Sequence, residues 1–402
     1  MLLDQLSSYE IWMEFLHRKS VANQMREIDI LDWENYIRDR SYLPLATSLD
    51  QGARVLTPPE KKELNRLATD KKRVVYVYPD DEKRLLKVLA HLLYRYDDRL
   101  PSNCYAFRRK TGVRQALGRI VSCEDLSELS GYKADIHNYF NSIDTERLSR
   151  MLEEIVDDDP PLLSFLQELV LDKRVYSGGE LAEEDCGVKA GSPVSSFFAN
   201  IYLLALDRHF QEAGVLYARY SDDIILFDQA GKLDAHISLI RDFLEGHGLA
   251  VNRDKEMVIP PGAAFTYLGF HYDGGELDIA PESVRKLMGR IRRSARSLRR
   301  WSEGKKISPD TLLYLFNRKY NRRFYGYQEH SLCWSRWYFP LLTTDRSLLR
   351  IDSYMQDYQR YLVTGRHNKA NRARVPYFRM KEAGYRPLVP AYYKSLEEFS
   401  AR

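Results

Sequence analysis

The sequence predicts an α/β protein whose last third is helical and basic. Short runs rich in Tyr, Ile, Val and Phe, such as YARYSDDIILF at 217–227, favour strands. Segments with apolar residues at helical spacing lie between these runs, and from 281 onward only the helical pattern remains. Because 44% of the 402 residues are hydrophobic, the chain can bury a large core, and we expect two or three subdomains.

The first half of the chain predicts helices followed by strand–helix units. Residues 1–50 carry an apolar stripe at helical spacing, and the Gly- and Pro-containing segment 50–62 indicates a boundary. Segment 71–101 predicts a strand, a proline turn and an amphipathic helix. Segment 131–144, GYKADIHNYFNSID, predicts a strand that enters a turn. The helix TERLSRMLEEIV follows, capped by Asp144 or Thr145.

The second half predicts one long helix and two strands before the basic region. The apolar segment 192–210 predicts a single helix with Pro193 near its start, where proline is tolerated. The strand-forming run at 217–227 follows, and then a helix over 233–248. FTYLGFHYD at 265–273 predicts another strand.

The composition favours a soluble cytoplasmic protein with no membrane partner. The four cysteines lie far apart without a CxxC pair, so they fit neither a disulfide framework nor a zinc site. The first 15 residues contain three acidic side chains, and we therefore expect no signal peptide. The longest apolar run, FFANIYLLAL at 197–206, is too short to span a bilayer.

Basic residues gather in the last third, although the net charge is only +4. Segment 285–300 has eight basic residues and no acidic ones, and 317–323 and 366–374 continue the excess. A single basic run is usually a solvated helix face, but three runs interleaved with aromatic residues favour a nucleic-acid track. The acidic segments 153–159 and 180–185 are the competing partners.

The dipeptide Asp222–Asp223 interrupts the apolar run at 217–227. A hairpin turn is the ordinary explanation, because Ser and Asp are turn formers. A bound divalent cation is the alternative, because it would neutralise both carboxylates. A third carboxylate, Asp135, ends the predicted strand GYKAD, where by itself it fits an N-cap or an Asx turn. Together the three supply hard oxygen ligands for two Mg²⁺ ions about 3.5–4 Å apart, as two-metal phosphoryl transfer requires.

Four ordered motifs resemble those of reverse transcriptases: KADIHNYFNSID, GVKAGSPVSSFFANIYLLALD, YARYSDDIILF and YLGFHY. RVVYVYPDDEKRLL and NCYAFRRKTGVRQAL resemble the two finger motifs upstream, so the resemblance covers roughly 65–280. The tail from WSRWYFPLL onward is similar to the thumb of group II intron-like enzymes.

This resemblance implies a right-hand polymerase of the α/β class, with an antiparallel palm sheet. We expect a helical N-terminal extension (1–50), fingers (51–131), a palm with finger–palm insertions (132–279) and a helical basic thumb (280–402). The implied activity is RNA-directed DNA polymerisation with two Mg²⁺ ions, or Mn²⁺ as an alternative. The partners would be an RNA template, dNTPs and the cDNA product; the oligomeric state is left open.

The resemblance also assigns roles to individual residues around the expected metals. Asp135, Asp222 and Asp223 match the catalytic metal ligands, with Ile136 beside them. Phe140 matches the steric gate that excludes a 2′-hydroxyl, although it also fits a core aromatic. The remaining nucleotide-binding positions lie in one loop and in the fingers: Ala190, Gly191, Pro193 and Ser195 in the loop, and Arg73, Arg84 and Arg108 in the fingers. Each of these arginines by itself also fits a surface charge.

Primer and template positions are expected in the palm and the thumb. Tyr220 would support the primer end, and Leu268 and Gly269 match the primer-grip hairpin. A helix over 285–300 would group exposed basic side chains and turn Leu287, Ile291 and Leu298 inward. Those basic side chains form two adjoining rows: Lys286, Arg290, Arg293 and Arg300 in one, and Arg292, Arg296 and Arg299 in the other.

One position departs from the family pattern, and the subgroup is a further expectation. Many relatives have Gln-Gly where this chain has Ala190-Gly191, which puts nucleotide affinity and fidelity in doubt but not the metal chemistry. The N-terminal helices, the AGSPVSS loop and the basic thumb resemble the bacterial "unknown group" enzymes of phage defence, which copy a partner non-coding RNA. The alternatives are a template-independent or protein-primed polymerase of the abortive-infection type, a retron or group II intron-type enzyme, and an inert RNA-binding scaffold.

Overall fold

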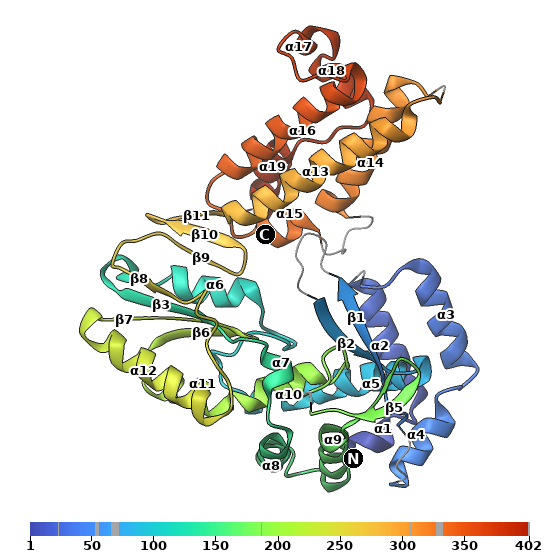
Figure 1. The fold of residues 1–402 in the computed structure, drawn as a ribbon, viewed down its shortest axis with the longest axis vertical. Coiled ribbons are helices and arrows are strands. Elements are labelled where there is room, and N and C mark those ends of the chain that lie inside the picture. Colours follow the sequence, from blue (N-terminus) through green and yellow to red (C-terminus); the bar gives the residue numbers. More distant parts are fainter. Residues whose placement is uncertain are drawn as a thin grey trace. The chain divides into compact units, whose positions relative to one another are not determined.

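A computed structural model of the chain divides into two compact units, 1–18 with 25–262, and 19–24 with 263–402 (Figure 1). The structure describes residues 1–22, 24–52, 56–65, 72–185, 187–305, 307–326 and 333–400. Among these residues, no helix is both long and apolar enough to cross a membrane.

The first unit begins with four helices, as the sequence predicts: α1 (Leu2–Gln5), α2 (Tyr9–Val21), α3 (Glu27–Arg38) and α4 (Leu43–Asp50). Trp12 anchors them, because its side chain is fully buried and stacks on Tyr42 at 4.4 Å between ring centroids. Its Nε1 donates a hydrogen bond to the Leu6 carbonyl at 2.7 Å, so the indole has a polar partner in the core.

A four-stranded sheet follows, in the order β2-β1-β4-β5. Its strands are β1 (Glu60–Asn65), β2 (Lys72–Val77), β4 (Arg174–Ser177) and β5 (Glu180–Glu183). Only β2 was predicted, because EKKELN in β1 has neither the alternation nor the residue types of a strand. The predicted helix after β2 is α5 (Asp80–Leu92), followed by η1 (Leu93–Arg99), α6 (Val113–Val121) and η2 (Leu126–Glu128).

The expected antiparallel sheet is confirmed in the same unit, with the order β6-β7-β3-β8. It consists of β3 (Ser130–Asp135), β6 (Leu216–Tyr220), β7 (Asp223–Asp228) and β8 (Met257–Ile259), of which the short β8 was not predicted. β3 and the apolar centre of β7 are largely buried, so packing fixes which side chains face each side of the sheet.

Six further helices belong to this unit: α7 (Tyr139–Ser142), α8 (Thr145–Ile155), α9 (Pro160–Leu171), α10 (Ser195–Tyr202), α11 (Leu204–Glu212) and α12 (Ala230–Gly246), of which α11 and α12 pack on the sheet. Asp144 caps α8, as predicted, by accepting from the amides of Glu146 and Arg147. The single long helix predicted over 192–210 is wrong, because the chain breaks at Leu203 (φ −104°, ψ 11°) into α10 and α11. An apolar run without Gly or Pro carries no local signal for such a break.

The second unit contains a three-stranded sheet, β11-β10-β9, and seven helices among its described residues. The strands are β9 (Phe265–Tyr267), β10 (Phe270–Asp273) and β11 (Glu276–Ile279). The single strand predicted over 265–273 is wrong, because Leu268 (φ 48°) and Gly269 (φ 87°) form a two-residue hairpin turn.

The helical prediction from 281 onward is confirmed. The helices are α13 (Pro281–Ser302), α14 (Pro309–Tyr325), α15 (Trp334–Tyr338), α16 (Arg346–Thr364), α17 (Asn371–Arg374), α18 (Tyr377–Glu382) and α19 (Leu388–Ser400).

Gly131→Ala should lower the free energy of unfolding by about 1–3 kcal/mol. A Cβ at position 131 would lie 2.4 Å from the buried ring of Phe227, its partner across the β3–β7 ladder. Gly118→Ala in α6 is the matched control, because a Cβ there meets nothing within 4 Å. This substitution should raise the free energy of unfolding by about 0.5–1 kcal/mol. Urea unfolding of both variants checks this; equal stabilities would contradict the overpacking at Gly131.

Candidate functional site

A tight hairpin turn joins β6 to β7 at the predicted place, with Asp222 in the turn and Asp223 as the first residue of β7. Tyr220 pairs with Asp223 across β6 and β7, so Ser221 and Asp222 are the two loop residues. Ser221 has a φ of 61°, a left-handed conformation that a type II′ turn requires at this place and usually gives to glycine. A serine there carries backbone strain, which the surrounding structure must hold in place.

Strand pairing brings Asp135 to the same end of the sheet. Asp135 is the last residue of β3 and lies opposite Asp223 in the β3–β7 ladder. The next residue, Ile136, donates its backbone N–H to the carbonyl of Asp222 at 3.0 Å. The backbone therefore joins the three predicted carboxylates, Asp135, Asp222 and Asp223, and places Ile136 beside them.

Burial and a neighbouring carboxylate raise the pKa of both Asp222 and Asp223. Burial, followed by the charge of Asp222, raises the pKa of Asp223 to about 6. Burial also raises the pKa of Asp222, and the charge of Asp135 adds to the rise. Burial is the larger cause in both cases, and the neighbouring carboxylates add to it.

Two residues that sequence reasoning missed, Lys255 and Asn252, hold Asp135. Lys255 Nζ lies 2.6 Å from Asp135 Oδ2, and Asn252 Nδ2 donates to Oδ1 at 3.1 Å. The Asn252 amide also donates to the Asp135 carbonyl at 2.7 Å. Both residues lie more than a hundred positions from Asp135 in a polar loop, so no local pattern identifies them.

The donor chemistry of this site fits a hard divalent cation. The carboxylates offer the oxygen ligands that Mg²⁺ prefers, and their raised pKa values indicate negative charge that a cation would stabilise. Over the residues that the structure describes, no three His, Cys, Asp or Glu side chains form a ready metal-binding group. The ammonium group of Lys255 is the cation beside Asp135.

Phe140 packs among aromatic rings near the start of α7. Its ring lies 5.7 Å from that of Tyr139 and 6.5 Å from that of Phe107, and the side chain is half-buried. Its carbonyl accepts the Val188 amide at 3.0 Å. Gly187 allows this approach, since a Cβ there would lie 2.4 Å from the Phe140 carbonyl oxygen. Phe140 therefore has core contacts and a partly open face.

The predicted nucleotide loop is attached to strand β2. The Tyr76 amide donates to the Ala190 carbonyl at 2.8 Å, and Gly191 adopts φ +102°, where a Cβ would lie 3.1 Å from the Tyr76 carbonyl oxygen. Pro193 follows in the turn, and Ser195 Oγ donates to the Lys189 carbonyl at 2.8 Å. The backbone of this loop is thus fixed on both sides.

The predicted finger arginines make contacts with protein atoms. Arg84 Nη2 lies 2.7 Å from Asp32 Oδ2, and its guanidinium stacks 4.3 Å from the ring centroid of Tyr36. Arg108 donates to three backbone carbonyls, those of Asp97, Pro101 and Cys104. The side chain of Arg73 lies outside the described part of the structure. Binding of a triphosphate by these residues stays a prediction.

The predicted primer positions lie in both units. Tyr220 is half-buried at the end of β6. Leu268 and Gly269 form the β9–β10 turn of the second unit, where a Cβ on Gly269 would approach the Tyr338 hydroxyl to 3.3 Å. Their contact with a primer stays a prediction.

Helix α13 presents most of its predicted basic side chains to solvent. Arg290, Arg293 and Arg296 are exposed, whereas Leu287 and Ile291 are buried. Lys286, also exposed, pairs with Glu282 at 2.7 Å. Among the described residues, no ion pair involves the three arginines, which we call the α13 arginine strip.

Arg299 does not belong to the exposed basic rows, contrary to the prediction. It is half-buried and donates to the carbonyl of Leu362 at 2.9 Å, because α13 packs on α16 there. Leu298 is half-buried rather than fully inward.

The acidic segments 153–159 and 180–185 form ion pairs with basic residues of the first unit. Asp158 contacts Arg95 at 2.9 Å, and Glu184 contacts Lys61 at 2.6 Å.

The chain belongs to the reverse transcriptase family. The family model described as reverse transcriptase (RNA-dependent DNA polymerase) matches residues 59–272. This range includes the antiparallel sheet, all three carboxylates and the loop fixed to β2.

Among solved structures, the fold is similar to telomerases. The apo telomerase of Candida tropicalis truncated from its C-terminal domain has a TM-score of 0.45 and 13% identity, with 56% of each chain covered. The Candida albicans telomerase with a TWJ fragment of telomeric RNA has a TM-score of 0.46 and 12% identity, over 87% of this chain and 68% of that one. The chain thus spans little more than half of the first structure. No curated protein matches it.

Asp223→Asn should raise the free energy of unfolding at neutral pH in EDTA by about 1–3 kcal/mol. With a folded pKa of about 6, the native state binds this proton more tightly than the unfolded chain, so ionisation of Asp223 opposes folding. The gain should be full above the folded pKa and disappear as the pH falls below the usual value of 3.8, where both states are protonated.

Asp228→Asn is the control on the same strand. Although burial opposes it, the hydrogen bond from His236 lowers the pKa of Asp228, so its loss should reduce stability at neutral pH. Denaturant melts at several pH values measure both effects, and a stability loss in Asp223→Asn would contradict the raised pKa of Asp223.

Proposed function

We propose that this protein is an RNA-directed DNA polymerase in which Asp135, Asp222 and Asp223 bind the catalytic metal ions. The observation that carries the proposal is the β3–β7 register, which places Asp135 opposite Asp223 within a matched reverse transcriptase domain. When bound, two Mg²⁺ ions, or Mn²⁺, would activate the primer 3′-hydroxyl and stabilise the leaving pyrophosphate.

The chain's own residues would orient the reactants around these ions. Lys255 and Asn252 hold the side chain of Asp135, and the Ile136 amide holds the carbonyl of Asp222. Phe140 offers a half-buried ring that could close the space beside the sugar of a dNTP. The backbone at Ala190 and Gly191 would form the opposite wall, since β2 fixes its course.

We further propose a cytoplasmic enzyme of the defence-associated bacterial subgroup, which copies a cognate non-coding RNA into cDNA. The support is the motif pattern together with the α13 arginine strip, whose unpaired charge suits the phosphates of an RNA–DNA duplex. Sequencing the nucleic acid that copurifies with the protein, and the product it makes, tests this. An untemplated polymer would favour the abortive-infection type instead.

Asp222→Ala with Asp223→Ala should abolish Mg²⁺-dependent synthesis while RNA affinity stays near that of the parent. The ligands would be lost, but the exposed arginines of α13 remain. Primer extension and RNA-binding isotherms measure the two properties, with Asp228→Asn as a control outside the carboxylate cluster. Substantial Mg²⁺-dependent synthesis by the double variant would refute the metal assignment.

Reversing Arg290, Arg293 and Arg296 to Glu should weaken binding of any duplex by a similar factor and flatten its salt dependence. Each lost phosphate contact removes counterion release, so the slope of log K against log salt should fall by about 0.7–0.9 per contact. Arg26→Glu with Arg38→Glu, two exposed arginines that already pair with aspartates, is the control. An unchanged slope in the folded triple variant would indicate a merely solvated strip.

A further inference from the structure

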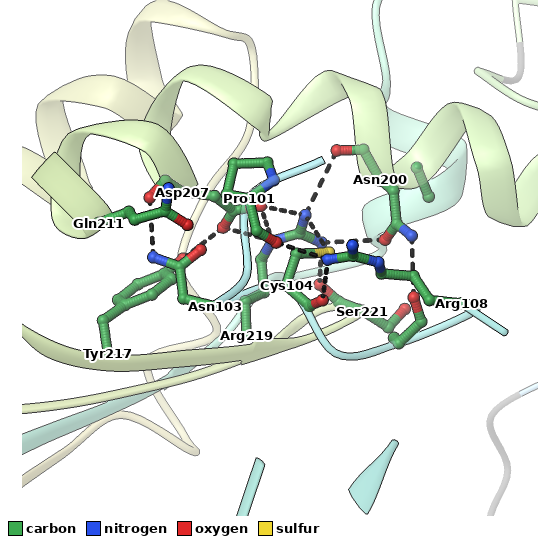
Figure 2. A network of polar contacts seen from close by, with 12 residues as sticks. Pro101, Asn103, Cys104, Arg108, Asn200, Asp207, Gln211, Tyr217, Arg219 and Ser221 are labelled. Carbon is green, nitrogen blue, oxygen red and sulfur yellow. Dashed lines mark hydrogen bonds and ion pairs between the residues drawn. The ribbon is translucent and has the colours of Figure 1, made fainter. Parts of the chain in front are cut away.

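A fully buried ion pair contacts the backbone of the Ser221–Asp222 turn. Arg219 of β6 and Asp207 of α11 are both at 0% exposure, and Arg219 Nε donates to the two carboxylate oxygens at 2.8 and 3.0 Å (Figure 2). Tyr217 Oη also donates to Asp207, at 2.9 Å. Burial opposes the charged guanidinium, but the Asp207 carboxylate keeps the pKa of Arg219 well above its usual value.

The same guanidinium holds the turn itself. Arg219 Nη1 donates to the Ser221 carbonyl at 3.1 Å, and Nη2 lies 3.1 Å from Cys104 Sγ and 3.3 Å from the Asn200 carbonyl. Because Ser221 has a positive φ, its peptide orientation depends on such outside contacts. Arg219 therefore links a rigid buried anion to the residue that precedes Asp222.

The backbone of Arg219 is fixed as well. Its amide donates to the Asn103 carbonyl at 3.0 Å, and its carbonyl accepts the Tyr105 amide at 2.9 Å. Asn103 Nδ2 in turn donates to the Asp207 carbonyl at 2.8 Å. Hydrogen bonds therefore hold both the backbone of Arg219 and its guanidinium group.

We propose that Arg219 is a positioning residue for polymerisation: the Asp207–Arg219 pair holds the strained Ser221 peptide so that Asp222 keeps its place beside Asp135. This inference rests on the proposed metal-binding role of Asp222 and Asp223. A buried ion pair rarely adds net stability compared with apolar residues of the same size. The planar guanidinium can donate to the carboxylate and to a carbonyl at once, which the single ammonium of Lys cannot do in the same geometry.

The competing explanation is that the pair only fills the core between α11 and β6. The two explanations differ in what Arg219→Lys does to the turn. Lys keeps the charge opposite Asp207 but loses the fork that reaches Ser221. Tyr217→Phe is the matched control, because it removes a hydrogen bond from the same Asp207 carboxylate and leaves the Arg219–Ser221 contact intact.

The first measurement uses the metal-free protein. Hydrogen exchange of the Ile136 amide, which donates to the Asp222 carbonyl, should be at least about tenfold faster in Arg219→Lys, while β3–β7 ladder amides stay protected. Tyr217→Phe should exchange like the parent at Ile136. The second measurement is Mn²⁺ binding followed by electron paramagnetic resonance, where Arg219→Lys should raise the dissociation constant about 10-fold or more.

Rescue separates positioning from stability. Ser221→Gly removes the conformational penalty of the positive φ, so the Arg219→Lys/Ser221→Gly double variant should recover much of the lost Mn²⁺ affinity. If Arg219→Lys does not fold, Asp207→Glu, which keeps the pair but moves it by a methylene, should accelerate Ile136 exchange in the same way.

Two outcomes would overturn the proposal: Ile136 exchange and Mn²⁺ affinity unchanged in folded Arg219→Lys, or equal shifts in Tyr217→Phe. The exchange measurement needs no metal, so it stays informative if the metal assignment itself fails. That separate failure would appear as Mn²⁺ binding that survives Asp222→Ala with Asp223→Ala.

Discussion

The pairing of β3 with β7 is the constraint on which the rest of the site depends, because it holds like charges together. Six residue pairs, from Ser130–Asp228 to Asp135–Asp223, fix the register. A slip of one residue would turn the side chain of Asp135 to the other face of the sheet. Ile224, Ile225 and Leu226 are each fully buried and alternate between the two faces of the sheet, so a slip would disrupt close packing on both faces. Apolar burial in the middle of the strands therefore offsets the cost of the carboxylates at their end.

The costly features of this sheet concentrate at one end, where chemistry is proposed. A positive φ at Ser221, raised carboxylate pKa values and a buried ion pair all lie within a few residues. None of these features stabilises the fold appreciably, because each opposes folding or adds little to it. Such a concentration of unfavourable local choices is expected at functional sites rather than across a fold.

The sequence predicts features set by neighbouring residues better than contacts between residues that are far apart along the chain. The three aspartates were recognisable because strand-forming runs adjoin them and because the family motifs contain them. Lys255 and Asn252 were not, since they meet Asp135 only through tertiary folding. The break at Leu203 was missed for a different reason, because it lies in an apolar run whose pattern also fits one continuous helix. The residue pattern over 265–273 likewise favoured one strand, whereas the family resemblance placed a hairpin at Leu268 and Gly269, which the structure has.

Burial also constrains Ala190, the position at which the sequence departs from the expected family pattern. Ala190 is 8% exposed, and its carbonyl accepts the Tyr76 amide, so the position faces the packed side of the loop. A glutamine amide in this conformation would need buried partners for its donors and acceptor. The neighbouring Gly191 has no room for a Cβ without crowding the Tyr76 carbonyl. Under the proposed function, nucleotide contacts at this wall would therefore come from the loop backbone and the Phe140 ring, not from a side chain at 190.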